Sequence, residues 1–166
     1  MDYIRTRHSV YLLTYHMIFV TNYRRPVIMN EIGDFMKATA KRLCVGYGGE
    51  LLSAEADRDH IHILVSLPPT CDVSLVVRSL KTQLSKETHA VPEYNQFVQK
   101  YLPEGTPLWS PTYFVATTGS VSLETMKSYI EEQRTDENKR KYERRSKYWE
   151  GKGKSRFKKK DLDDLR

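Results

Sequence analysis

Residues 57–67 limit the possible folds of this chain more than any other stretch. Apolar side chains occupy every second position there: Ile61, Ile63, Val65 and Leu67. This period is typical of a β-strand with one buried face. Because successive side chains of a strand point to opposite faces, we expect His60 and His62 together on the other face. Two imidazoles on one strand can hold a metal ion, but histidine is also an ordinary residue of a solvated sheet surface. The pair alone leaves both interpretations open.

The length and composition fit a globular protein. The chain has 166 residues, enough for one domain with a hydrophobic core. No apolar run approaches the roughly 20 residues that cross a bilayer, and the first residues lack the pattern of a signal peptide. We therefore expect a cytoplasmic protein with no membrane partner. Cys44 and Cys71 form no CxxC pair, so free thiols are expected in a reducing compartment.

The positive charge is concentrated at the C-terminal end. Residues 138–166 hold 13 Lys and Arg against 5 Asp and Glu, a local charge of +8 where the whole chain has +6. This shift predicts a domain over residues 1–137 followed by a basic tail or helix over 138–166. Such a segment attracts polyanions by releasing their counterions. The alternative is a solvated tail that only aids solubility.

The order of the expected elements predicts the fold class. Strands are predicted over residues 9–20, 50–56, 57–66 and 112–117. Helices are predicted over residues 31–45, 72–88 and 123–137. Residues 89–107 contain three prolines and are expected to form a loop with about one helical turn. Strand–helix–strand–strand–helix–strand is the order of a ferredoxin-like, or RRM-like, α+β fold. We expect an antiparallel sheet with helices on one face and a late helix after it.

The late helix carries the second group of candidate residues. Tyr129 and Gln133 are four apart, so they lie one turn from each other on one helix face. A tyrosine hydroxyl can attack a phosphodiester, but its pKa of about 10 means that it needs a metal or a base to help. The Gln133 carbonyl can complete a neutral ligand set with two imidazoles, which suits Mg²⁺ or Mn²⁺ with open positions. The alternative is that Tyr129 simply packs at a helix edge.

Taken together, these motifs resemble the HUH single-tyrosine transposases of small bacterial and archaeal insertion sequences that move as single-stranded DNA. The similarity spans roughly residues 10–133 in the right order. It rests on five motifs, at residues 15–25, 60–62, 109–115, 119–120 and 129–133. Each motif is weak alone, and the combination is specific.

The resemblance implies a site and a reaction. His60, His62 and Gln133 would hold Mg²⁺ or Mn²⁺, and Tyr129 would attack the scissile phosphate to leave a 5′-phosphotyrosine and a free 3′-hydroxyl. It also implies recognition of DNA hairpins near the element ends by a homodimer. The tyrosine helix of one subunit can complete the histidine site of the other, with the turn at residues 118–122 as a hinge.

Basic residues are the candidates for contacts with DNA phosphates. Those outside the tail are Arg5, Arg7, Arg24, Arg25, Arg78 and Lys81. The alternative is that each of them is ordinary solvated surface, as exposed Lys and Arg side chains usually are.

Three other functions fit parts of the same pattern. One is a domesticated HUH endonuclease that serves the host cell. Another is a non-catalytic single-stranded nucleic-acid-binding protein, since open ferredoxin-like sheets bind RNA by stacking, although histidines stand where that mode needs aromatic residues. The last is a metal hydrolase with water as the nucleophile, which predicts that Tyr129→Phe keeps its activity.

Overall fold

The structure is a computed structural model that describes residues 3–117. The predicted helix over residues 123–137, with Tyr129 and Gln133, lies outside the described residues. So does the basic segment over residues 138–166, and with it the predicted boundary between the two parts of the chain.

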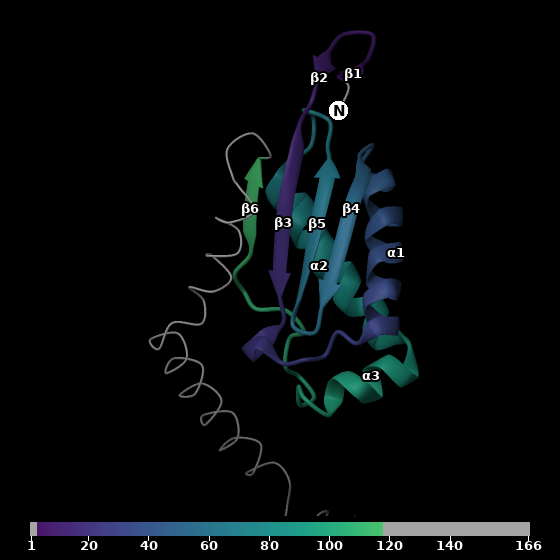
Figure 1. The fold of residues 1–166 in the computed structure, drawn as a ribbon, viewed down its shortest axis with the longest axis vertical. Coiled ribbons are helices and arrows are strands. Elements are labelled where there is room, and N and C mark those ends of the chain that lie inside the picture. The colour runs from purple at the N-terminus through teal and green to yellow at the C-terminus, as the bar shows by residue number, and fades with distance from the viewer. Residues whose placement is uncertain (1–2, 118–166) are drawn as a thin grey trace, which may run out of the picture. The chain divides into compact units, whose positions relative to one another are not determined.

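A four-stranded antiparallel sheet is the centre of the fold (Figure 1). Its strands are β3 (Thr14–Val20), β4 (Glu50–Asp57), β5 (His60–Ser66) and β6 (Phe114–Thr117). They lie in the order β4-β5-β3-β6, so the first and third of these strands along the chain are central. This is the arrangement of a ferredoxin-like α+β fold, as predicted.

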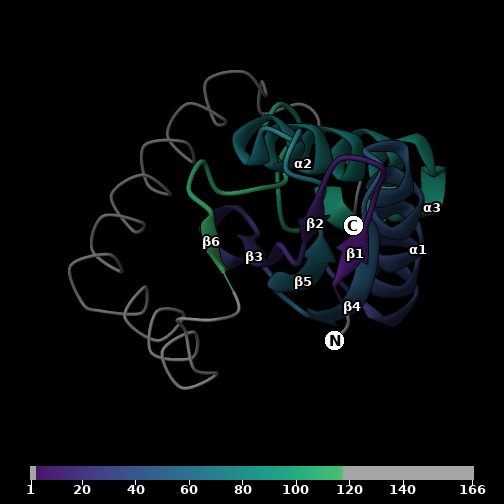
Figure 2. The same cartoon turned by 90° about the horizontal axis from the view of Figure 1, so that it is seen from above.

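Three helices accompany the sheet: α1 (Asn30–Gly46), α2 (Val73–Ala90) and α3 (Pro92–Gln99). Seen from above, α1 and α2 lie on the same side of the sheet (Figure 2). Asp72 starts α2 as its N-cap, where its carboxylate accepts from the backbone N–H groups of Ser74 and Leu75. None of the helices among residues 3–117 is both long enough and apolar enough to span a bilayer.

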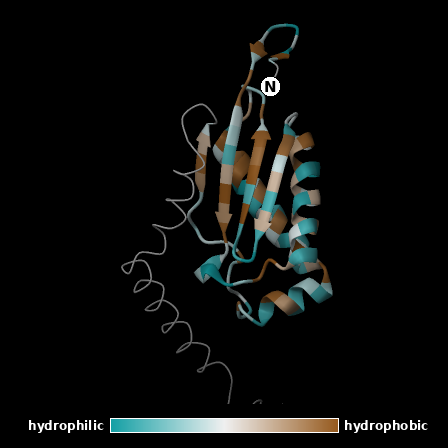
Figure 3. Ribbon diagram, in the orientation of Figure 1, coloured by the Kyte–Doolittle hydropathy of each residue, from teal (hydrophilic) through white to brown (hydrophobic). Residues whose placement is uncertain are grey.

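The hydrophobic core lies between the sheet and the helices. The alternation predicted for β5 is confirmed, because Ile61, Ile63 and Val65 are at most 1% exposed. Residues of β3 and of both long helices pack around them: Met17, Phe19, Met36, Ala40, Leu80 and Leu84. Figure 3 shows the corresponding hydrophobic segments along β3 and β5. The side chains between these core residues on β5 therefore project from the opposite face.

The prediction of one continuous strand over residues 9–20 is wrong. Strand β3 starts only at Thr14, and β2 (Val10–Tyr11) pairs instead with β1 (Ile4–Arg5) in a separate two-stranded sheet. The reason lies in the neighbouring strand. β5 ends at Ser66, opposite Thr14, and the prolines that follow have no N–H group with which to extend the ladder. One further bond, from the Leu67 N–H to Leu13 O, follows before Pro68, and the chain before Leu13 pairs with β1 instead.

The loop expected over residues 89–107 contains a helix, α3, that the prolines concealed. Pro92 stands in its first turn, where the missing N–H costs nothing. The residue before it, Val91, is extended and ends α2. Val98 of α3 is buried in the core, with Tyr94 and Phe97 packed against it. Helix α3 thus takes up part of the expected loop. Strand β6 also begins two residues later than predicted, at Phe114.

Candidate active site

His60 and His62 lie side by side on the face of the sheet that α1 and α2 do not cover. Their ring centroids are 5.0 Å apart, and both residues are half-buried. In β3, Val20 stands opposite His60 and Ile18 opposite His62. The structure thus brings the two imidazoles together on one face, as their spacing predicted.

Two acidic residues flank the histidines on the edge strand. Asp57 and Glu55 of β4 are the cross-strand partners of His60 and His62, and both carboxylates are exposed. Directly opposed residues of an antiparallel pair share a face of the sheet. The histidine pair therefore has apolar neighbours on β3 and negative charge on β4.

The His62 imidazole is held toward its neutral form. Burial lowers its pKa, and the nearby His60 and His16 lower it further, while Glu55 and Asp57 act in the opposite direction. His16 lies on the same face, because its partner on β5 is Leu64, two residues from His62. Only a neutral imidazole has a lone pair to give to a metal ion, so this environment favours the ligand form of His62.

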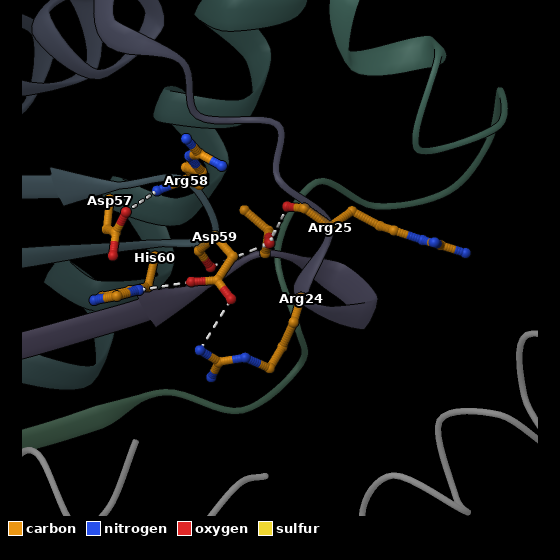
Figure 4. A network of polar contacts seen from close by, with 7 residues as sticks. Arg24, Arg25, Asp57, Arg58, Asp59 and His60 are labelled. Atoms are coloured by element: carbon orange, nitrogen blue, oxygen red, sulfur yellow. Dashed lines mark hydrogen bonds and ion pairs between the residues drawn. The ribbon is translucent and has the colours of Figure 1, made fainter. Parts of the chain in front are cut away.

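The His60 ring is fixed by its sequence neighbour. Its Nδ1 lies 2.7 Å from Asp59 Oδ1, and the other carboxylate oxygen, Oδ2, lies 2.9 Å from Arg24 Nη2 (Figure 4). A carboxylate can only accept, so the neutral ring carries its proton on Nδ1 and its lone pair on Nε2. Metal-binding histidines characteristically have such a partner on the second ring nitrogen.

Arg24 reaches Asp59 from an unusual turn. The short 3₁₀ helix η1 (Asn22–Arg24) follows β3, and within it Tyr23 and Arg24 have φ values of 55° and 50°. Left-handed backbone is uncommon for such residues. The Arg24–Asp59 contact is an ion pair whose alignment falls short of a hydrogen bond, and Arg24 Nη1 is buried without a hydrogen-bond partner among the described residues.

Hydrogen bonds tie this turn to the loop before β5. The Thr21 N–H donates to Asp59 O at 2.8 Å. The Thr21 hydroxyl lies 2.8 Å from Arg25 O and 3.1 Å from Asp59 O. Residues 21–25 and 58–60, distant in sequence, therefore form one structural unit at the end of the sheet.

The described residues fit part of a divalent metal site. Asp59 engages His60 at Nδ1, which leaves Nε2 as the nitrogen that would bind an ion, and the ring centroids of His60 and His62 are 5.0 Å apart. Among residues 3–117, however, no three His, Cys, Asp or Glu side chains gather closely enough to hold a metal. A third protein ligand would come from elsewhere, and the predicted one, Gln133, lies outside the described residues.

The predicted phosphate contacts are spread over three places. Arg24 and the exposed Arg25 belong to the turn beside His60. Arg5 and Arg7 belong to the β1–β2 hairpin, which joins β3 at its Thr14 end, whereas His60 pairs with Val20 at the other end. Arg78 and Lys81 are on α2, behind the sheet. The structure does not gather these residues around the histidines.

Sequence reasoning missed Asp59 and Thr21. Both stand in short polar turns, where side-chain periodicity gives no signal. The one available hint was the position of Asp59 directly before His60, since an adjacent carboxylate can reach an imidazole without any help from tertiary structure.

Comparisons with known proteins agree on one family. Residues 9–133 match the family described as transposase IS200 like. The ISDra2 transposase TnpA of Deinococcus radiodurans is 30% identical over 131 residues, which cover 79% of this chain and 91% of that protein. The Salmonella typhimurium transposase for insertion sequence element IS200 is 29% identical over 127 residues, 76% of this chain and 80% of that protein.

A solved structure shares the fold. The crystal structure of a Deinococcus radiodurans protein assigned as a transposase aligns with a TM-score of 0.66 at 30% identity, covering 78% of this chain and 97% of that one. The matched family region includes both histidines and the turn that carries Arg24.

Proposed function

The chain belongs to the family of IS200-like transposases, and from that premise we propose that it cuts and rejoins single-stranded DNA at insertion-sequence ends through a covalent phosphotyrosine. The observation that best supports this is the pair of half-buried imidazoles, one of them fixed at its Nδ1 atom by a carboxylate. Phosphoryl transfer needs positive charge held beside the phosphate. The two imidazoles can hold a metal ion that supplies this charge.

In the proposed reaction, Tyr129 is the nucleophile. Its hydroxyl oxygen forms a bond to the scissile phosphorus, and the bond from phosphorus to the 3′ oxygen breaks. That oxygen takes a proton and leaves as a 3′-hydroxyl, while the 5′-phosphate stays joined to Tyr129. Rejoining is the reverse step, in which a 3′-hydroxyl attacks a phosphotyrosine and frees the phenol. Each step exchanges one phosphoester bond for another, so no nucleotide cofactor is required.

The histidines and Gln133 are proposed to hold the metal. Mg²⁺ or Mn²⁺ would polarise the phosphate and offset the negative charge of the transition state. His60 offers Nε2 because Asp59 occupies Nδ1, and His62 offers a neutral ring because its pKa is lowered. All three ligands are uncharged, so the cation keeps its full charge for the phosphate oxygens.

We also propose that the protein acts as a homodimer on single-stranded DNA with hairpin ends. In a symmetric dimer, each Tyr129 helix can serve the histidine pair of either subunit. Hairpin recognition would come from the basic residues, of which Arg5, Arg7, Arg25 and Arg78 are exposed.

The proposed chemistry is tested by trapping the covalent product. Protein, Mg²⁺ and labelled single-stranded DNA that carries the element end are incubated and then separated under denaturing conditions. We expect a labelled protein–DNA adduct that is lost in Tyr129→Phe and kept in the control Tyr101→Phe, which removes the same hydroxyl from an exposed tyrosine outside the site. Cleavage that persists without an adduct in Tyr129→Phe would instead indicate a hydrolase with water as the nucleophile.

A further inference from the structure

A half-buried ion pair between Arg24 and Asp59 stands beside His60. Arg24, Asp59 and His60 have side chains that are only 14%, 20% and 15% exposed. Removing an ion pair from water is costly unless the geometry is good and the remaining polar atoms find partners. Here the carboxylate turns one oxygen to each neighbour (Figure 4), although Arg24 meets it as an ion pair without a hydrogen bond, and Arg24 Nη1 has no hydrogen-bond partner among the described residues. The arrangement therefore fixes Asp59 between a permanent cation and the imidazole.

We propose that Asp59, held in place by Arg24, is a positioning residue that locks His60 as the Nδ1–H tautomer and turns Nε2 toward the metal site. This inference rests on the proposed function of His60 as a metal ligand. Asp59 itself touches neither the metal nor the DNA. Its role is to keep the lone pair on the correct nitrogen and to stop the ring from rotating about its χ2 bond. Arg24 in turn keeps the carboxylate aimed at the ring.

The backbone around Arg24 supports a functional role for this contact. Two consecutive non-glycine residues, Tyr23 and Arg24, have left-handed backbone, and such strain persists only where the surroundings enforce it. The enforcing contacts are the hydrogen bonds from Thr21 to Asp59 O and Arg25 O. These bonds join the strained turn to the loop that carries Asp59. The backbone conformation of the turn therefore places Arg24 next to the carboxylate.

The two histidines are supported differently. Among the described residues, the His62 ring has no hydrogen-bonded carboxylate comparable to Asp59. Its neighbours include the opposed side chains of Ile18 and Glu55 and the imidazoles of His60 and His16. Asp59 should consequently affect His60 alone. This asymmetry provides an internal control, since the tautomer of His62 in the same spectra should not respond to changes at position 59.

The direct test is the tautomer of His60 in metal-free protein. Nitrogen-15 NMR of the imidazoles in their neutral state is expected to show His60 as the Nδ1–H form. In Asp59→Asn the amide can either accept from Nδ1–H or donate to a bare Nδ1, so we expect a mixture of both forms. His60→Gln and His62→Gln assign the signals. An unchanged His60 tautomer in Asp59→Asn would overturn the proposal.

The second measurement is affinity for Mn²⁺, followed by calorimetry or by the electron paramagnetic resonance of the free ion. Loss of a partner behind a metal-binding histidine typically weakens affinity by about 10–100-fold, and that is the loss expected for Asp59→Asn. Asp57→Asn is the matched control, because it removes the same charge opposite His60, while the hydrogen bond that its side chain accepts among the described residues comes from the Arg58 N–H. Equal losses in the two variants would show that only local charge matters, and would refute positioning.

Arg24→Gln tests the ion pair between Arg24 and Asp59. We expect a smaller loss of Mn²⁺ affinity and a partial shift of the His60 tautomer. A variant that loses DNA affinity but keeps both the tautomer and Mn²⁺ affinity would show that Arg24 serves the DNA and not Asp59. If a single variant unfolds because it leaves one buried charge uncompensated, the double variant Arg24→Gln/Asp59→Asn removes both charges and should still scramble the tautomer.

Failure of the proposed function gives a different result from failure of this inference. Wild-type protein that binds no Mn²⁺, with His60 nevertheless in the Nδ1–H form, would refute the metal site. If Asp59→Asn binds Mn²⁺ as tightly as wild type, the positioning role is refuted and the metal site remains supported.

Discussion

The ammonium group of Lys81 donates to the carbonyl oxygen of Ser110 at 2.7 Å, which ties helix α2 to the segment that enters strand β6. The carbonyl oxygens of Pro111 and Thr112 lie 3.4 Å from the same nitrogen. Burial lowers the pKa of Lys81, which is the electrostatic cost of this internal position. A residue predicted to contact phosphate thus has a structural role as well.

Replacing Lys81 by Met should loosen the entry to β6. Methionine keeps most of the volume but donates no hydrogen bond, so we expect the free energy of unfolding in urea to fall by about 1–3 kcal/mol. The control is Arg78→Met on the same helix, where the side chain is exposed and the change should stay within about 0.5 kcal/mol. Equal stability of the two variants would contradict the structural role.

Gly49 occupies a position with no room for a side chain. A Cβ atom there would lie 2.5 Å from Ser66 O and 2.8 Å from a Leu67 methyl carbon, whereas at Gly46 it would meet nothing within 4 Å. Gly49→Ala forces the backbone of two strands apart, and we expect it to cost about 1–3 kcal/mol in urea denaturation. Gly46→Ala should be neutral or slightly stabilising, because alanine favours helix. A tolerated Gly49→Ala would show that the β4–β5 end adjusts freely.

The buried thiol of Cys44 should make the fold sensitive to alkali. Burial raises its pKa from 9.0 to about 11. In the unfolded chain the thiol ionises at the lower value, so unfolding releases a proton between these pH values and the protein loses stability as the pH rises through them. Below the lower value the contribution is fully present.

The measurement is the free energy of unfolding in urea at a series of pH values. Cys44→Ala should lose less stability across that window than wild type, by no more than about 3 kcal/mol. Cys71→Ala, which removes the half-buried thiol, is the control and should follow the wild-type curve. A Cys44→Ala curve parallel to wild type would mean that other groups cause the alkaline loss.

The β1–β2 hairpin offers a test of hairpin-DNA binding. Replacing Arg5 and Arg7 by Gln should weaken binding at every sequence alike and reduce the slope of log affinity against log salt by about 2, one for each lost phosphate contact. The control Lys41→Gln/Lys86→Gln makes the same change of net charge at exposed helix positions. If both pairs reduce the slope equally, the effect reflects overall charge and not the hairpin.

Sharing of sites between subunits predicts complementation. A heterodimer of Tyr129→Phe and His62→Ala has one subunit with an intact histidine pair and the other with an intact tyrosine. We expect the mixed dimer to recover part of the adduct formation that each homodimer lacks. Verified heterodimers that form no adduct would indicate that each site is built within one chain.

The sequence predicted the elements that bury a face against the common core. The alternation in β5 and the helical spacing in α1 and α2 report directly on burial, and the structure confirms them. The missed features depend on neighbours in space. The length of β3 is set by the prolines after β5, and α3 is recognisable only once Val98 is known to be buried.

The candidate site divides in the same way. The shared face of His60 and His62 follows from strand geometry and needed no structure. The contact of Arg24 with Asp59 required a left-handed turn and the pairing of β3 with β5, neither of which leaves a periodic pattern. Asp59 was missed because a polar residue in a turn is ordinarily just solvated.

The hydrogen bonds that join Thr21 to Asp59 have a consequence for local stability. The Ile28 N–H also donates to Arg58 O, so the two loops share bonds on both sides of the strained turn. Neither loop can open without breaking the bonds of the other, and local unfolding at this end of the sheet is therefore cooperative. A mutation or a bound inhibitor that disturbs one loop would therefore unfold both loops together. The distant β1–β2 hairpin would stay folded.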